Sequence, residues 1–266
     1  MTQDGTRPVE IDTSKPHPAR IYDYLLGGKD NYDVDRKAGD QLAAVAPEVW
    51  ISVRANRGFL QRAVRHVVDS GVRQILDVGT GLPTSPNVHE IAQKAAPDVR
   101  VAYVDNDPIV KAHGDALLNR AGTTSIVLAD LRDPRSVVEH PEVRRIIDFD
   151  QPVALFLVAI LHFIRDAEDP ERIVATLRDA LPAGSFLVLS HATDDFADDR
   201  SEAQAVYNNA TATMNLRPRA RIEQFFDGFE LVEPGVIQVP FWRPDATPPE
   251  GSQDIGFYGG VAVKKG

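Results

Sequence analysis

The stretch Ile75-Leu-Asp-Val-Gly-Thr-Gly-Leu-Pro83 decides the fold of this 266-residue chain. Its apolar residues, which end in Asp77, predict a buried parallel strand, and Gly79 and Gly81 predict a tight turn into a helix. We expect that helix to begin at Ser85-Pro86, with the serine as N-cap and the proline at the first position. A strand, a glycine turn and a helix in this order bring bare backbone against a ligand at the carboxyl edge of a sheet. The stretch therefore predicts a nucleotide or nucleoside site.

Two common phosphate-binding motifs do not fit this turn. A P-loop needs Gly-Lys-Ser/Thr at the start of the helix, which the sequence lacks. A dinucleotide fingerprint, G-x-G-x-x-G/A, fails at Thr84, where its third small residue belongs. Asp77, two residues before the first glycine, suits a cationic group such as the ammonium of an amino-acid tail. The pattern D-x-G-x-G resembles the first motif of the Rossmann-like S-adenosylmethionine (SAM) methyltransferases.

Two further apolar strands end in an acidic residue and support this interpretation. Residues 101–105 end in Asp105, 24 residues after Gly81, near the spacing at which an acid meets ribose hydroxyls. Residues 125–130 end in Asp130, which in the methyltransferase pattern accepts from the adenine amino group. Because the carboxyl ends of parallel strands share one sheet edge, we expect Asp77, Asp105 and Asp130 to surround one ligand.

Other residues complete the expected SAM site. Gly79, Thr80 and Gly81 are expected at the amino-acid tail and the ribose. Arg57 precedes the first strand and is shaped to bind the methionine carboxylate, although a surface salt bridge suits a guanidinium equally well. The predicted cofactor contacts are Tyr32, Arg57, Asp77, Gly79, Thr80, Gly81, Asp105, Asn106, Asp130, Leu131, Val158 and Ala159.

The resemblance extends over nearly the whole chain. The run Pro18-Ala-Arg-Ile-Tyr-Asp-Tyr-Leu-Leu-Gly-Gly-Lys-Asp-Asn-Tyr32 resembles the opening signature of an actinomycete family catalogued as SAM-dependent methyltransferases and formerly as a domain of unknown function. Arg54-Ala-Asn-Arg57, Val104-Asp-Asn-Asp-Pro108 and Phe226-Asp-Gly-Phe-Glu-Leu-Val-Glu-Pro-Gly235 are similar to it as well. The likeness covers residues 12–264. It implies the fold and SAM as the cofactor, and it names no substrate.

We expect a single α/β domain with a Rossmann-like, seven-stranded, mostly parallel sheet and an antiparallel last strand. Helices are expected at 17–26, 35–46 and 49–70, and the later strands at 152–162, 185–191, 229–239 and 256–264. The expected segments are a flexible tail (1–16), a helical lid (17–72), a nucleoside-binding core (73–190), an insertion with the last helix (191–228, helical at 198–214) and strands six and seven (229–266). A lid would exclude water from the reaction. The alternative is that the front helices merely pack on the core.

Composition limits the possible functions. With 43% hydrophobic residues the chain can bury a sizeable core, and the lack of cysteine excludes disulfides and thiolate chemistry. The net charge of −10 weighs against a nucleic-acid partner, because the longest basic cluster is only Arg217-Pro-Arg-Ala-Arg221. No signal peptide or long apolar run is present, so we expect a cytoplasmic protein without membrane contact. No histidine pair has zinc spacing, so we expect no metal site.

Two histidines are candidate catalytic bases. His162 and His191 are expected at the ends of the fourth and fifth strands, and an imidazole with a pKa near neutrality accepts a proton from a hydroxyl, phenol or amine. Asp194 and Asp195 lie close enough in sequence to orient His191. The alternative is that His162 is a structural residue beside the cofactor and that His191 is a wall of the pocket.

The expected reaction transfers a methyl group from SAM to an oxygen or nitrogen of a small-molecule acceptor. Val158-Ala-Ile-Leu stands where methyltransferases of nucleic-acid amino groups carry an Asn/Asp-Pro-Pro-Tyr motif, and without cysteine the two-cysteine chemistry used on cytosine carbon is excluded. Two alternatives stay open, a non-catalytic SAM-binding or regulatory protein and, less favoured, an NAD-dependent oxidoreductase. The failed third glycine, Asp77 and the antiparallel end argue against the oxidoreductase.

Overall fold

The computed structural model describes residues 13–118, 122–196, 205–206 and 210–266. Its centre is an eight-stranded sheet in the order β3-β2-β1-β4-β5-β8-β6, with β7 paired to β8. The strands are β1 (Gln74–Val78), β2 (Arg100–Asp105), β3 (Thr124–Leu128), β4 (Ala154–Val158), β5 (Phe186–Ala192), β6 (Glu230–Leu231), β7 (Ile237–Gln238) and β8 (Phe257–Val263). Strands β1 to β5 are parallel, and β8 runs antiparallel to β5. The predicted α/β class, mostly parallel sheet and antiparallel end are confirmed.

Two predicted strands are too long. Instead of one strand over residues 229–239, the structure has the short strands β6 and β7. Glu233-Pro234-Gly235 separates them, because proline lacks the N–H that a ladder needs and Gly235 has a φ of 83°. The fourth strand ends at Val158, because Ala159 takes a left-handed φ of 56°. His162 therefore lies beyond that strand, in the 3₁₀ turn η1 (Leu161–Phe163).

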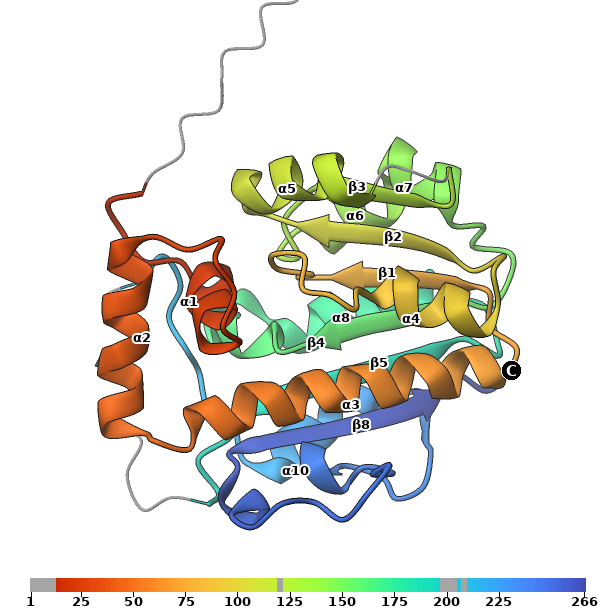
Figure 1. Ribbon diagram of the computed structural model, residues 1–266. Helices are drawn as coiled ribbons and strands as arrows, with labels where there is room; N and C mark the ends of the chain where they lie inside the picture. Colours follow the sequence, from red (N-terminus) through yellow and green to blue (C-terminus); the bar gives the residue numbers. More distant parts are fainter. Residues whose placement is uncertain (1–12, 119–121, 197–204, 207–209) are drawn as a thin grey trace, which may run out of the picture.

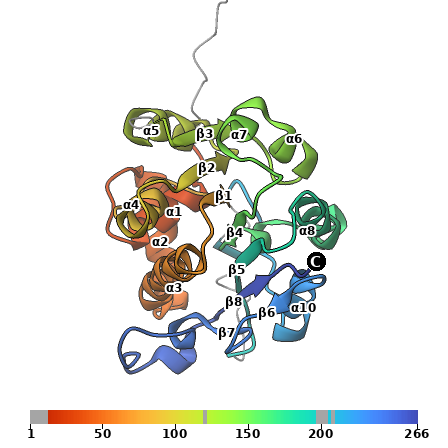
Figure 2. The ribbon, with the colours of Figure 1, turned by 90° about the vertical axis from the view of Figure 1, so that its right-hand side faces the viewer.

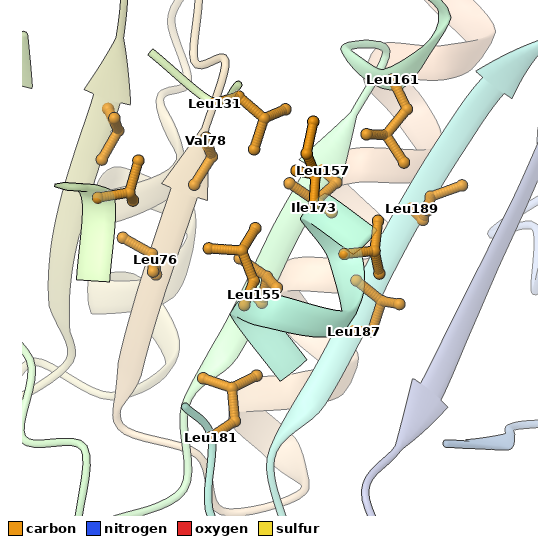
Figure 3. Close-up of a cluster of buried hydrophobic side chains, with 14 of the residues drawn as sticks. Leu76, Val78, Leu131, Leu155, Leu157, Leu161, Ile173, Leu181, Leu187 and Leu189 are labelled. Carbon is orange, nitrogen blue, oxygen red and sulfur yellow. The ribbon is translucent and has the colours of Figure 1, made fainter. Parts of the chain in front are cut away.

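Helices cover both faces of the sheet (Figure 2). On one side lie α3 (Val49–Asp69), α4 (Val88–Ala95) and α5 (Pro108–Leu118), and on the other α6 (Pro134–Glu139), α7 (Pro141–Ile146), α8 (Pro170–Asp179) and α10 (Arg219–Glu223). Strand side chains alternate between the two layers. Leu76 and Val78 enter the core drawn in Figure 3, whereas Ile75 enters the core on the opposite face. Both faces of the central strands are thus buried.

The helix after the glycine turn begins later than predicted. Helix α4 starts at Val88 with Asn87 as its N-cap, so Ser85-Pro86 lies before it. The reason is a capping box, since Glu90 stands three residues after Asn87 and its Oε2 accepts the Asn87 N–H at 2.6 Å. Ser85 has valine at the corresponding position.

The front helices divide between two roles. Helices α1 (Pro18–Leu25) and α2 (Asp33–Val45) lie beyond the carboxyl ends of β1 and β2 (Figure 1) and form an apolar cluster with Val53 and Met214. In contrast, most of α3 lies along the sheet, where Phe59 is fully buried in its core. Apolar residues at helical spacing pack α3 against the sheet, so only α1 and α2 lie where a lid would have to be. The name lid is used below for α1 and α2, and their covering of a ligand stays a prediction.

Some predictions fall on residues that are only partly described. Most of the predicted tail (1–16) and of the helix predicted over 198–214 lies outside the described residues. None of the helices in the described part of the chain has the length and apolar character that crossing a bilayer requires. Within the same residues, no three metal-ligating side chains form a cluster.

Candidate active site

A cavity of about 720 Å³ opens at the carboxyl edge of the sheet. Its walls are the ends of β1 to β4, the inner side of the lid, the start of α3 and residues 210–216. The predicted site residues that line it are Arg57, Asp77, Gly79, Thr80, Gly81, Asp105, Asn106, Asp130, Leu131, Val158, Ala159 and His162. The structure thus brings these twelve residues to one cavity, while Tyr32 and His191 do not line it.

Asp77 sits at the bottom of the cavity as a buried carboxyl group. Its side chain accepts one hydrogen bond, from Thr80 Oγ1 to Oδ2 at 3.2 Å. Burial raises the pKa of Asp77 to about 7, against the lowering effects of the Thr80 hydrogen bond and the Arg57 charge. A cationic ligand group would supply the missing counter-charge, so the position fits an ammonium.

Asp105 is held by the backbone of the loops that surround it. Gly81 N–H donates to Oδ2 and Asp107 N–H donates to Oδ1, both at 2.9 Å. Burial raises the pKa of Asp105 to about 6. Asp105 lines the cavity, and a carboxylate there can accept hydrogen bonds from ribose hydroxyls.

The two glycines of the turn have different environments. Gly79 has a φ of 76°, and a Cβ there would lie 2.5 Å from Ile160 Cγ1. Gly81 has a φ of 67°, and a Cβ there would meet only Ala19 Cβ, at 4.0 Å. Gly79 is therefore needed for packing against Ile160, whereas Gly81 leaves space open inside the cavity.

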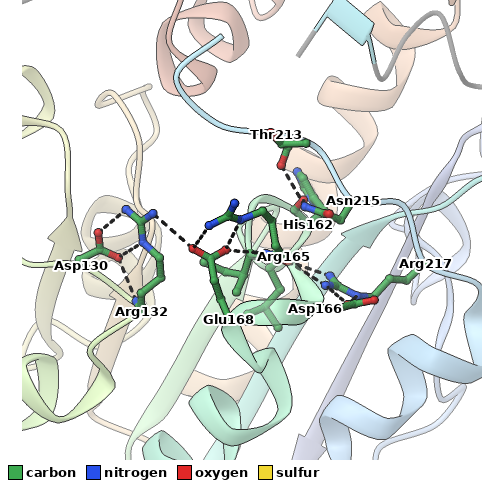
Figure 4. Close-up of polar contacts among 11 residues, drawn as sticks. Asp130, Arg132, His162, Arg165, Asp166, Glu168, Thr213, Asn215 and Arg217 are labelled. Atoms are coloured by element: carbon green, nitrogen blue, oxygen red, sulfur yellow. Dashed lines mark hydrogen bonds and ion pairs between the residues drawn. The ribbon is translucent and has the colours of Figure 1, made fainter. Parts of the chain in front are cut away.

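The carboxylate of Asp130 already binds the side chain and backbone N–H of Arg132, a contact not predicted from the sequence. Arg132 donates from Nε and from its backbone N–H to Oδ1, both at 2.9 Å, and from Nη2 to Oδ2 at 2.5 Å (Figure 4). Asn106 Nδ2 approaches the same Oδ2 at 3.4 Å. These four donors use the acceptor sites of a carboxylate, and Arg132 holds the pKa of Asp130 below its usual value. An adenine amine can bond Asp130 only if the half-exposed Arg132 side chain turns away.

Arg57 holds the glycine loop. Its Nη2 donates to the carbonyl oxygens of Thr84 and of Pro86, the latter at 2.6 Å. Its buried Nε has no hydrogen-bond partner among the described residues. The guanidinium also faces Asp77, whose pKa it lowers. The predicted contact with the methionine carboxylate stays a prediction. In this structure the Arg57 side chain binds the carbonyl groups of the glycine loop.

Replacing Arg57 tests its influence on Asp77. Without the guanidinium the pKa of Asp77 rises further, so Arg57→Met should shift the pH at which S-adenosylhomocysteine (SAH) binding is half-lost upward by roughly 0.5–1 unit. Arg57→Lys keeps the charge and should shift it less. Calorimetric titrations of SAH from about pH 5 to about pH 8.5 measure this midpoint. Equal midpoints in wild type and Arg57→Met would show that Arg57 does not control Asp77.

Tyr32 does not lie over the cofactor site as predicted. It precedes α2, its side chain is 40% exposed, and the Arg20 guanidinium lies 5.3 Å from its ring centre. The backbone N–H of Tyr32 donates to Asp35 Oδ2 at 2.9 Å, and this bond holds Tyr32 at the start of α2, outside the cavity wall.

His191 is not placed to act as a base. Its side chain is fully buried, and Nδ1 donates to the Ala192 carbonyl at 2.6 Å while Nε2 accepts from Arg217 Nη1 at 2.9 Å. Burial and the adjacent Arg217 charge lower the pKa of His191 to about 3. This geometry does not support the predicted catalytic role or the predicted orientation by Asp194 or Asp195. Its partner Arg217 belongs to the basic cluster Arg217-Pro-Arg-Ala-Arg221, whose composition gives no sign of this contact.

His162 lies on the cavity wall but is also a poor base. Its Nδ1 accepts from the Ala192 N–H at 3.4 Å, which places the proton of the neutral ring on Nε2. Burial, together with His191 and Arg217, lowers the pKa of His162 well below its usual value. The geometry favours the structural alternative, a neutral wall residue.

A buried hydrogen-bond chain that the sequence analysis missed connects the lid to the sheet. Tyr22 of α1 accepts from Asn56 Nδ2 at 2.9 Å, and Asn56 Oδ1 accepts from Ser190 Oγ at 2.6 Å. Ser190 Oγ in turn accepts the N–H of Ala159 at 3.0 Å. Tyr22 and Asn56 belong to the two N-terminal motifs quoted above, which were the only signal of this connection.

Comparisons with known proteins agree with this geometry. The family model described as S-adenosyl methyltransferase matches residues 4–265. A DUF574 family protein of Streptomyces avermitilis is 47% identical, with a TM-score of 0.92, covering 96% of this chain and 100% of that one. A provisionally assigned methyltransferase of Thermobifida fusca is 41% identical, with a TM-score of 0.90 and coverage of 96% and 97%. No curated protein matches the chain.

A more distant likeness concerns the fold alone. The plantazolicin methyltransferase BamL, solved with a triazolic desmethylPZN analog and SAH, is 11% identical, with a TM-score of 0.55 and coverage of 93% of this chain and 96% of that one.

Proposed function

The chain belongs to the S-adenosyl methyltransferase family, and on that premise we propose that it methylates an oxygen or nitrogen of a small-molecule acceptor held in this cavity. SAM is its cofactor and methyl transfer its class of reaction. One observation carries the assignment of the site: Asp77, Gly81 and Asp105 line the same cavity as apolar side chains of the cluster under α1 and α2.

The residues present fit SAM. The buried carboxyl of Asp77 suits the ammonium of the methionine tail, and the two oxygens of Asp105 suit the ribose diol. The open space beside Gly81 allows the ligand to approach the backbone closely. Asp130 is assigned to the adenine amine, with Arg132 turning away when the base binds.

Bound SAM supplies a methyl group on a sulfonium, which is already a good leaving group. The work left to the protein is to align nucleophile, methyl carbon and sulfur and to exclude water. The strand-end residues hold the cofactor, and the lid, tied to the sheet through Tyr22, Asn56 and Ser190, closes the cavity above it.

Removal of the ribose contact tests the cofactor orientation. Asp105→Ala should weaken SAM binding about tenfold to a hundredfold, because a charged bidentate partner contributes on the order of 1.5–3 kcal/mol. Asp98→Ala, which removes an exposed carboxylate paired with Arg73 at 3.5 Å, is the control. Calorimetry and circular dichroism give affinity and fold, and an unchanged affinity in folded Asp105→Ala would rule out the ribose assignment.

The class of acceptor is tested by where the methyl group goes. With radiolabelled SAM and fractionated cell extracts, label should appear in the low-molecular-mass fraction. Label confined to protein or nucleic acid would contradict a small-molecule acceptor. The poorly basic His162 and the buried His191 favour a second candidate, a SAM-binding protein without turnover, which would bind SAM and transfer no label to any fraction.

A further inference from the structure

Part of the cavity wall is apolar, and the space beside this part is here called the acceptor chamber. Its walls are formed by Leu42, Val49, Val53, Phe163, Met214 and Phe257, which all line the cavity. The same six side chains belong to the apolar cluster under the lid, so they form one continuous surface. They come from α2, α3, η1, the segment 210–216 and the start of β8.

Two charged side chains of α1 that line the cavity, Arg20 and Asp23, already have partners. Arg20 pairs with Asp35 at 3.1 Å, with both side chains almost fully buried. Asp23 Oδ2 accepts from the Asp30 N–H at 3.0 Å and from Asn31 Nδ2 at 2.8 Å, and burial raises its pKa. A ligand charge in the chamber would find no uncommitted counter-charge among these groups. Burying a charge without a partner is costly.

The polar groups on the chamber wall are also poor proton acceptors. His162 presents its Nε2 as a donor because Nδ1 accepts from the Ala192 N–H. Asn56 uses its amide between Tyr22 and Ser190. The six chamber residues carry no carboxylate or imidazole, and burial lowers the pKa of the adjacent His162 well below its usual value, so the chamber itself offers the nucleophile no protein base.

We propose that the acceptor chamber binds a compact, apolar, uncharged ring compound that carries a hydroxyl or amine, and that this group releases its proton to water. This inference rests on the proposed function. In the transfer, the acceptor oxygen or nitrogen forms a bond to the methyl carbon, and the sulfur–methyl bond breaks with its electron pair moving to sulfur. The products are the methylated acceptor and SAH, with the proton in water.

Three naphthalenes of one size and different charge test the proposal. We would titrate 2-naphthol, 2-naphthoate and 2-naphthylmethylammonium into protein saturated with SAH and follow binding by calorimetry. The neutral naphthol should bind, and each charged probe should bind at least about tenfold more weakly, because its charge is buried unpaired. Binding of either ion as tightly as naphthol, or binding of none of the three, would overturn the proposal.

A chamber-filling variant tests the location. Ala212→Trp adds a large side chain on the half-buried, cavity-lining segment 210–216 and should abolish naphthol binding while SAH affinity is kept. Retained naphthol binding in that variant would place the probe elsewhere and contradict the proposal. The wild-type panel decides the question if this variant does not fold. Failure of wild type to bind SAH at all would instead count against the proposed function.

Discussion

Gly81→Val is expected to abolish SAM binding while leaving the core folded. A Cβ at Gly81 enters the open space of the cavity, where the nearest side-chain atom is Ala19 Cβ at 4.0 Å. The branched side chain of valine would fill the volume next to Asp105 that the ligand needs. Calorimetric titration with SAM should therefore give no measurable heat of binding, a loss of more than about a hundredfold.

Two matched glycines separate ligand exclusion from backbone strain. Gly122 has a φ of 69° with no atom within 4 Å of a built Cβ, so Gly122→Val carries similar strain outside the cavity and should bind SAM normally. Gly79→Val should instead lower stability, because its Cβ would lie 2.5 Å from Ile160 Cγ1. Normal SAM binding by Gly81→Val would show that this loop is not the contact surface.

Asp77→Asn is expected to produce opposite effects on binding and on stability. The pKa of Asp77 is about 7 in the folded protein and 3.8 in the unfolded reference. Because folding raises it, the stability contributed by the protonated form is complete below about pH 4 and is lost as the pH rises through about 7. At pH 8 the buried carboxylate thus destabilises the ligand-free protein, by on the order of 2–4 kcal/mol.

Asp77→Asn removes both the destabilising buried carboxylate and the negative charge that would pair with the ligand's ammonium. At about pH 8 its free energy of unfolding should exceed that of wild type by a similar amount, while SAH affinity falls about tenfold to a hundredfold. Wild-type SAH affinity should itself fall as the pH drops below about 7, because the cationic tail favours ionised Asp77. Denaturant unfolding and calorimetry measure the two effects, and a variant that loses stability without losing affinity would contradict the assignment.

The strand-end acids could be predicted because their placement depends on short-range sequence patterns. An apolar run followed by Asp77 or Asp105 predicts a buried parallel strand, and parallel strands deliver their carboxyl ends to one edge. Hydrophobic spacing likewise predicted the first three helices to within two residues at each end. Short-range pattern thus predicted the fold and the strand-end residues that line the cavity.

The remaining contacts could not be predicted because they join residues far apart in the chain or depend on competition for one group. His191 Nε2 accepts a hydrogen bond from Arg217, 26 positions away, and Asn56 accepts one from Ser190 across 134 positions. Strand β3 ends at Leu128, two residues before Asp130, and whether adenine or Arg132 binds the Asp130 oxygens depends on side-chain geometry. Such partners are fixed by tertiary packing, which periodicity does not describe.

A crystal structure of the protein with SAH tests the central claim most directly, because it locates each part of the ligand. We expect the ribose hydroxyls to lie within hydrogen-bond distance of the two Asp105 oxygens. The ammonium should lie beside Asp77, and the sulfur should face the acceptor chamber. Adenine should lie near Asp130 with Arg132 turned away from it. A ribose away from Asp105, or SAH bound outside this cavity, would contradict the account.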